Sequence, residues 1–312
     1  MKKIAISLLL LMTFTAHAQH IEPGSNWYNG AIIYNAMPYK GGSMVMSATA
    51  EGEELEFMLV PDKNDPDIYH TTTGPNDGYM AHMEGLTVKH IQQDALDVLC
   101  FYNTAGGLEK TMLKTDEWDS QQLNVEHWMH TVRGGYTMED GTRVTIDWDK
   151  ALVDGIYYPV EAVTFNGCVT GIIFFDGEGG PINGKYEVIY TKDGLHLYEV
   201  AFDDYGMWHR LPGNGIALTE CDPGRGLYDF ANQMMFYGNE LYDYDKAMLR
   251  LMRNSILAHH GYVFQSKDLQ DYFGNEAWYH PTANNDDIQL SLIEKLNINL
   301  IKNRETKPDS MQ

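Results

Sequence analysis

Hydrophobic and polar residues alternate along much of the chain between about residues 27 and 219, which is the pattern of β-strands. Val144, Ile146 and Trp148, for example, fall on one face of such a run. A later pair of alternating runs is joined by Asp193-Gly194, a sequence that favours the positive φ of a tight hairpin turn. Turn signals of this kind recur at short intervals, which argues against long crossover helices. The pattern predicts a mainly β body, an antiparallel meander that forms a sandwich or an open barrel.

Two parts of this body resemble each other. Residues 88–101 read like residues 187–200, with Leu96 aligned to Leu195, and residues 54–60 read like residues 169–175. One interpretation is an internal duplication that produces two similar β-units. The other is that any two hairpins look alike, because alternation and turn chemistry constrain both. Under the first interpretation the units cover residues 27–115 and 135–220.

C-terminal to this body, the spacing of apolar residues becomes that of helices. We expect a first helix that begins at Asp243 or Asp245, which are suited to capping, and ends at Gly261. A second, shorter helix follows, and Ser291 and Glu294 form a capping box that opens a third. The chain is therefore divided into a β-rich body at residues 19–235, a small all-α domain at 240–304 and a frayed polar tail at 305–312.

A run of residues in the helical region has a recognisable order. It includes Leu257-Ala258-His259-His260-Gly261 and the flanking stretches Arg253-Asn254, Tyr262, Phe264, Ser266-Lys267, Leu269, Tyr272-Phe273, Trp278-Tyr279, Pro281, Glu294, Asn297 and Ile301. This order resembles the YARHG domain, a family named for its Tyr-Ala-Arg-His-Gly stretch, with Leu257 in place of the tyrosine and His259 in place of the arginine. The resemblance covers about a fifth of the chain. It implies an extracytoplasmic helical module of bacterial envelope proteins, and it provides no catalytic residues to carry over to this chain.

Five residues of this module are candidates for binding: Arg253, His259, His260, Trp278 and Tyr279. The histidines could be metal ligands, but neighbours on a helix point about 100° apart, so we favour a hydrogen bond that holds His260 in a small core. Arg253 could clamp an anion, and we favour packing of its stem and a bond to a helix C-terminal carbonyl. The two aromatic residues could stack on a sugar or a peptide, and we favour a place in the core.

A second candidate site lies in the β-rich body. Asp62, Asn64, Asp65 and Asp67 offer oxygen atoms at near-alternate positions, as calcium-binding loops do. The run lacks the glycine and the distal glutamate of an EF-hand. We therefore favour a polar turn over a calcium site, and we expect no cofactor.

The N-terminus has the organisation of a secretory signal peptide. A basic start at Lys2 and Lys3 precedes an apolar run from Ile4 to Phe14, and Ala16-His17-Ala18 follows. The apolar run is shorter than the roughly 20 residues of a membrane-spanning helix. We expect cleavage after Ala18, so that residues 1–18 are removed. No cysteine follows the cleavage site, and we expect a periplasmic or secreted protein without a lipid anchor or a membrane span.

Composition restricts the partners. The chain has 22 Lys and Arg against 44 Asp and Glu, and loss of the two signal-peptide lysines takes the net charge from −22 to −24. Such a field repels nucleic acid and anionic lipid. The three cysteines, Cys100, Cys168 and Cys221, have no metal-ligand spacing. Export would permit one disulfide, and we favour buried thiols.

These observations favour a non-catalytic, exported cell-envelope protein with a binding or display role. The YARHG-like module would dock to an envelope protein or polymer. Two alternatives stay open: a secreted hydrolase whose site is assembled from separate loops, and a β-barrel carrier of a small apolar ligand. No sequence motif decides between an enzyme and a binding protein.

Overall fold

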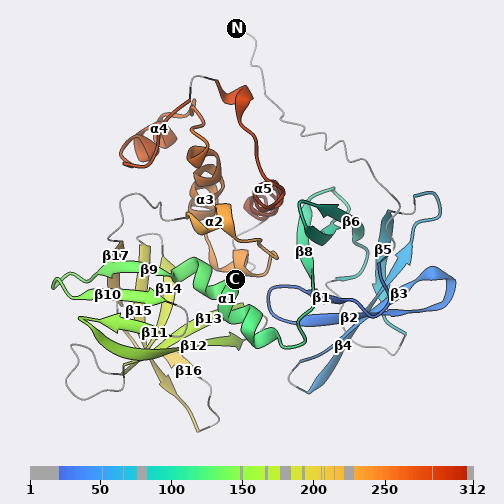
Figure 1. Ribbon diagram of the computed structural model, residues 1–312, viewed down its shortest axis with the longest axis horizontal. Helices are drawn as coiled ribbons and strands as arrows, with labels where there is room; N and C mark the ends of the chain where they lie inside the picture. The colour runs from blue at the N-terminus through green and yellow to red at the C-terminus, as the bar shows by residue number, and fades with distance from the viewer. Residues whose placement is uncertain are drawn as a thin grey trace.

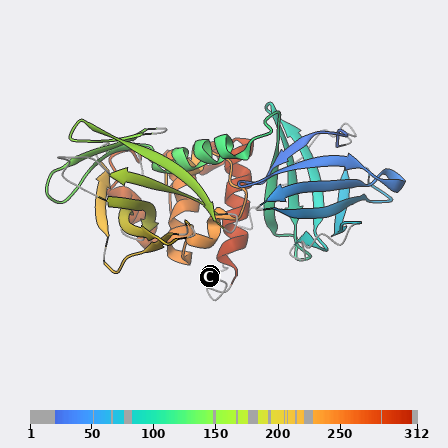
Figure 2. The same ribbon diagram turned by 90° about the horizontal axis from the view of Figure 1, so that it is seen from below.

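The computed structural model describes residues 21–307, apart from residues 51, 66, 76–82, 148–149, 166–167, 176–183, 192–193, 205, 207, 214, 221–227 and 283. Two β-barrels lie on either side of a group of helices, as both ribbon views show (Figures 1 and 2). The prediction of a mainly β chain with a small C-terminal helical region is confirmed. Trp148, which entered that prediction, and Cys221, one of the three cysteines, lie outside the described residues.

The first barrel is a closed meander of eight antiparallel strands. The first strand closes the ring by pairing with the last, Trp27 opposite Lys114. Each strand pairs with the next in sequence, as short turns require. Its strands are β1 (Asn26–Tyr28), β2 (Ile33–Pro38), β3 (Met44–Ala50), β4 (Glu53–Pro61), β5 (Ile68–Thr73), β6 (Thr87–Gln93), β7 (Leu96–Tyr102) and β8 (Leu108–Thr115), with the short helix η1 (Lys40–Gly42) between β2 and β3.

Alternation along these strands separates an interior from an outer face. On β7, Leu99 and Phe101 join the interior cluster, whereas Val98 and Cys100 belong to a different cluster on the outside. Large side chains fill the interior, among them Trp27, which is fully buried. The interior of an eight-stranded barrel is just wide enough for side chains to fill or for one small ligand to bind. Here side chains of the barrel itself occupy the described interior.

A second barrel of eight strands follows, closed by pairings of β17 with β9 and of β14 with β15. Its order repeats the meander of the first, except that β16 attaches to β15 outside the ring. The structure thus has two eight-stranded units, which lie within the ranges 27–115 and 135–220 of the duplication interpretation apart from the first residues of β1 and β9. The strands are β9 (Gly134–Thr137), β10 (Arg143–Asp147), β11 (Lys150–Val153), β12 (Ile156–Phe165), β13 (Cys168–Phe175), β14 (Gly184–Thr191), β15 (Gly194–Phe202), β16 (Trp208–Arg210) and β17 (Ile216–Glu220).

Helix α1 (Ser120–Val132) joins the two barrels, in a region where we expected only strands and turns. Its residues Trp128, Met129 and Val132 belong to the same cluster as the alternating interior residues of the second barrel. The Trp128 ring lies against Gly171 on β13, where an added Cβ would be 1.7 Å from it. The helix therefore completes the core of the second barrel. Its apolar residues are placed to pack against that barrel, so they do not form a clear helical repeat in the sequence.

The C-terminal helices follow the predicted signals. Asp245 caps α3 by accepting from the Met248 amide at 2.8 Å, and Gly261, with a φ of 74°, ends it. The Gly261 amide donates to the Ala258 carbonyl and the Tyr262 amide to that of Leu257, which is a Schellman motif. The capping box of Ser291 and Glu294 is present. The helices are α2 (Phe230–Gln233), η3 (Glu240–Asp243), α3 (Lys246–His259), α4 (Lys267–Gly274), η4 (Asn285–Asp287) and α5 (Leu292–Glu305).

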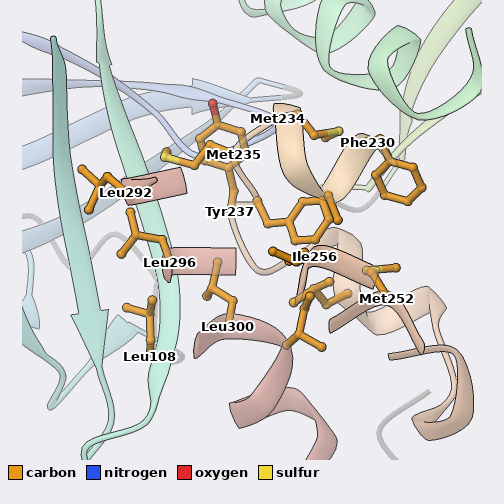
Figure 3. Packing of buried hydrophobic residues seen from close by; sticks show 14 of the residues in the cluster. Leu108, Phe230, Met234, Met235, Tyr237, Met252, Ile256, Leu292, Leu296 and Leu300 are labelled. Carbon is orange, nitrogen blue, oxygen red and sulfur yellow. The ribbon is translucent and has the colours of Figure 1, made fainter. Parts of the chain in front are cut away.

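The helical region shares one hydrophobic core with the outside of the first barrel. Leu108 on β8 belongs to the same buried cluster as Leu292, Leu296 and Leu300 on α5 (Figure 3). Residues from α2, α3 and the segment after α2 complete this cluster: Phe230, Met234, Met235, Tyr237, Met252 and Ile256. The barrel is therefore covered on its outer face at β1, β7 and β8 by residues from the other end of the chain.

The frayed tail expected from residue 305 is attached at its start. Helix α5 includes Glu305, and Lys307 forms an ion pair with Glu109 on β8. Residues 308–312 lie outside the described residues. The contact of Lys307 with Glu109 attaches this segment to the first barrel.

Candidate functional site

The end of α3 brings His259 against Trp278. The two rings stack with their centroids 4.1 Å apart and their planes inclined by 12°. Asp229, just before α2, places Oδ1 3.3 Å from Nε2 of His259. That nitrogen is buried and has no hydrogen bond among the described residues. The histidine therefore lies between an aromatic face and a carboxylate, both from segments distant in sequence.

Burial dominates the electrostatics of His259. It lowers the pKa of the imidazole below its ordinary value, and the neighbouring His260 lowers the pKa further. The carboxylates of Asp229 and Glu294 act in the opposite direction and do not cancel the shift. His259 is consequently neutral near neutral pH, so the position where the family name has an arginine carries no charge here.

His260 binds a different partner from His259. Its Nε2 lies 2.6 Å from Oε1 of Glu294, while the other carboxylate oxygen of Glu294 accepts from the Ser291 amide at 2.7 Å. One carboxylate thus ties the end of α3 to the start of α5. The two histidines diverge, as neighbours on a helix do, and no cluster of metal-binding side chains is found among the described residues.

Arg253 pairs with a side chain and not with the helix carbonyl that we expected. Its Nε and one terminal nitrogen donate to the two carboxylate oxygens of Glu305, at 2.9 and 3.3 Å. Arg253 lies in the middle of α3 and Glu305 at the end of α5, so this forked pair joins the two helices at a second place, away from His260. An exposed anion would have to compete with Glu305 for the guanidinium.

Trp278 and Tyr279 lie in the loop after α4, partly buried against a small cluster of their own. This cluster has Ala258, Phe264, Leu269 and Phe273 at its centre. The Trp278 indole nitrogen donates to Glu276 at 3.0 Å, and the Tyr279 hydroxyl to the Tyr262 carbonyl at 2.7 Å. Each of the five candidates thus contacts other parts of the same module.

The candidate calcium loop uses its oxygen atoms internally. Oδ1 of Asp62 accepts from the amides of Asn64 and Asp65, at 2.8 and 3.1 Å, and Oδ1 of Asp65 accepts from Asp67 at 3.0 Å. The other oxygen of Asp62 lies 2.9 Å from His70 Nε2. Hydrogen bonds from His70 and from the Asn64 amide lower the pKa of Asp62. These are the bonds of a polar turn between two strands.

A polar group at one mouth of the first barrel was not found from the sequence. His90 Nε2 lies 2.5 Å from Asp97 Oδ1, and Lys114 lies 2.9 Å from Glu22 and 3.8 Å from Asp97. Burial disfavours the charged form of Asp97, but hydrogen bonds from His90 and Gln92 and the charge of Lys114 outweigh it, so the pKa of Asp97 is lowered. The signal in the sequence is one polar residue on the interior-facing side of each of the strands β6, β7 and β8. From the sequence alone, such a residue looks the same as one on the outer face of a strand.

Asn297 is a second residue whose role the sequence did not indicate. It is fully buried on α5. Its side-chain amide donates to the carbonyls of Ala231 and Met234, at 2.9 and 2.8 Å, and its oxygen accepts from the Phe236 amide at 2.9 Å. The helical module therefore begins at α2, before residue 240, where we placed its start.

The described part of the chain has no helix with the length and apolar character needed to cross a membrane. No curated protein and no solved structure matches the chain. A family model matches the chain, over a range that includes α2 as well as α3 to α5, in agreement with the contacts of Asn297. That family is associated with extracellular proteins. Residues 227–306 of this chain match the YARHG domain.

Proposed function

We propose that this is a non-catalytic protein of the bacterial cell envelope, exported to the periplasm or secreted, with a binding or display role. Its YARHG region would dock to an envelope protein or polymer. Support for export comes from the signal-like N-terminus and from the extracellular association of the family. The acidic chain would favour neutral or basic partners over nucleic acid.

The observation that carries the docking role is the division of the helical region into two parts. Helices α2, α3 and α5 share a core with the first barrel. Helix α4 and the loop after it pack on a separate small cluster and lie away from both barrels in Figure 1. A rigidly attached base with a projecting lobe presents a fixed surface, which reduces the entropy lost on binding.

The polar face of α4 is therefore the surface that we assign to docking. Lys267 and Gln270 are exposed on it, while Leu269 and Phe273 face the small cluster. Of the five candidates from the sequence, His259, Trp278 and Tyr279 would shape this lobe from within, whereas Arg253 and His260 join α3 to α5 in the base. In this proposal His259 and Trp278 position α4, and they do not touch the partner.

Co-sedimentation with purified, insoluble envelope polymer tests the proposal. The mature chain should sediment with the polymer, and a variant that combines Lys267→Glu and Gln270→Ala should stay in solution. A matched variant, Lys302→Glu with Asn299→Ala, makes the same changes on exposed positions of α5. If both variants sediment like the unchanged protein, the α4 surface does not dock, and if the unchanged protein stays in solution, a polymer partner is excluded.

A further inference from the structure

Three of the large hydrophobic side chains that are exposed in the described chain belong to segments at one rim of the first barrel. Trp118 is 79% exposed, Met37 43% and Tyr39 41%. Tyr39 follows the end of β2 and Trp118 follows the end of β8. Asn35 on β2 and Thr115 on β8 both pair with Asn26 on β1, so at this level β2 and β8 lie about 10 Å apart, twice the spacing between strands, and both continue past the start of β1 at the same rim. We call Met37, Tyr39 and Trp118 the rim patch.

Hydrogen bonds hold the backbone of the patch in place. Asn26 on β1 donates to the Glu117 carbonyl at 3.3 Å, and Asn35 on β2 donates to Asn26 Oδ1 at 2.9 Å. The residue before Trp118 is thus bonded to β1, the strand that lies between β8 and β2, and β1 is bonded in turn to β2, which precedes Tyr39. An exposed tryptophan on a fastened backbone exposes apolar surface with little flexibility, which is the usual property of a binding anchor.

The charges around the patch select the partner. Asp116, Glu117 and Asp119 flank Trp118, and all three are exposed. Lys114, near the end of β8, is already paired with Glu22 at 2.9 Å. Aromatic faces attract cations, and Lys40 places its Nζ 5.9 Å from the Tyr39 ring centroid. An anionic partner would be repelled by these carboxylates and by the net charge of the chain.

We propose that the rim patch binds a basic segment of a partner protein, with an arginine or lysine side chain against the Trp118 ring and the neighbouring carboxylates as counter-charges. This surface belongs to the first barrel and is independent of the α4 docking surface. Basic segments gain from both features at once, because the guanidinium or ammonium group stays paired while its stem covers the aromatic ring.

Binding of a labelled peptide of alternating arginine and glycine to the mature protein tests this proposal. We expect one binding site, with affinity reduced about tenfold by Trp118→Ala and less by Trp118→Phe, which keeps an aromatic face. The double variant Asp116→Asn/Glu117→Gln should also weaken binding and reduce its salt dependence. The Lys267→Glu/Gln270→Ala variant should bind the peptide normally.

Two matched controls separate a specific site from attraction to an acidic protein. Tyr157→Ala removes another exposed aromatic residue, 64% exposed on the second barrel. Asp286→Asn/Asp287→Asn removes two exposed carboxylates from η4. Both should leave the affinity unchanged. The proposal is overturned if Trp118→Ala binds as tightly as the unchanged protein, or if the control variants weaken binding as much as the rim variants do.

Discussion

Asn297 connects the last helix to a segment more than 60 positions earlier through three buried hydrogen bonds. The side-chain NH2 group of Asn297 donates to two backbone carbonyls, and its side-chain oxygen accepts from the Phe236 amide. A buried backbone group without a partner costs about 1–3 kcal/mol, so the side chain stabilises the fold mainly by preventing that loss.

Replacing Asn297 by alanine should therefore lower the free energy of unfolding by about 3 kcal/mol or more, because three buried backbone groups lose their partner. Asn299→Ala on the same helix is the matched control, since Asn299 is exposed. Denaturant unfolding followed by circular dichroism measures both. Equal stability of the two variants would contradict the role given to Asn297.

His259 should make stability depend on pH. Burial lowers its pKa in the folded state, so the unfolded chain takes up a proton first as the pH falls below about 6.5. The contribution of His259 to the free energy of unfolding is fully present above that pH. It is lost as the pH falls from that value through the lowered pKa of the folded state. The free energy of unfolding should decrease between pH 7.5 and 5.5, about one unit to either side of the ordinary histidine pKa.

A His259→Phe variant isolates this effect, because phenylalanine can keep the stack on Trp278 and cannot take up a proton. Its stability should change less over the same pH range. His209→Gln, at an exposed position of the second barrel, should behave like the unchanged protein. An undiminished pH dependence in His259→Phe would assign the effect to other groups.

Local signals were readable from the sequence, whereas distant partners were not. The Asp245 cap, the Gly261 stop and the Ser291–Glu294 capping box each depend on residues within a few positions of one another. The partner of Asn297 and the carboxylate bound by Arg253 are set by how helices meet. Their sequence separations, 61 and 52 positions, are beyond any periodic pattern.

For the strands, the sequence indicated which segments pair in hairpins but not which face of each strand is buried. The resemblance of residues 88–101 to 187–200 pairs β6–β7 with β14–β15, which hold the same places in the two rings. It aligns Leu96 with Leu195, yet Leu195 lies in the second barrel's core and Leu96 packs on the outside of the first. A shift by one residue exchanges the two faces. The match of residues 54–60 to 169–175 pairs the fourth strand with the fifth, so duplication stays a hypothesis.

Helix α1 is explained by its fit to the second barrel. Trp128→Ala should cost about 3–5 kcal/mol, because it leaves a cavity in that barrel's core. Gly171→Val should also destabilise, since its side chain would enter the volume of the Trp128 ring.

The double variant of Trp128→Ala and Gly171→Val should cost less than the sum of the two, because each change makes room for the other. Chemical denaturation of the four proteins measures this coupling. Gly213→Val is the control, as an added Cβ there meets no atom within 4 Å. Strict additivity would show that the ring does not occupy the space at Gly171.

The hydrophobic clusters divide the chain differently from its sequence order. One cluster joins the first barrel's outer face to the C-terminal helices, and another belongs to α1 and the second barrel. A division into a β-rich body and a separate helical domain follows composition. The shared hydrophobic core instead groups the first barrel with the helices. This grouping depends on contacts between distant segments, which the periodicity of a sequence does not indicate.

Thermal unfolding should reflect this grouping. Leu108→Ala on β8 and Leu296→Ala on α5 should lower the same transition by several degrees, since both leave a cavity in one shared cluster. Val144→Ala should lower the transition of the second barrel. Calorimetry of the three variants distinguishes the cases. A separate helical transition, moved by Leu296→Ala alone, would show that the module folds independently.

The ion pair between Glu109 and Lys307 joins positions that are 198 residues apart. During synthesis, strand β8 therefore exists long before the helix that covers it. The first barrel can close early, but the apolar outer face that includes Val98, Cys100 and Leu108 has to wait for α5. Contacts that form so late slow folding and prolong the exposure of apolar, aggregation-prone surface. Under the proposed export the chain would emerge N-terminus first, and in this interval chaperones outside the cytoplasm would have the largest apolar surface to cover.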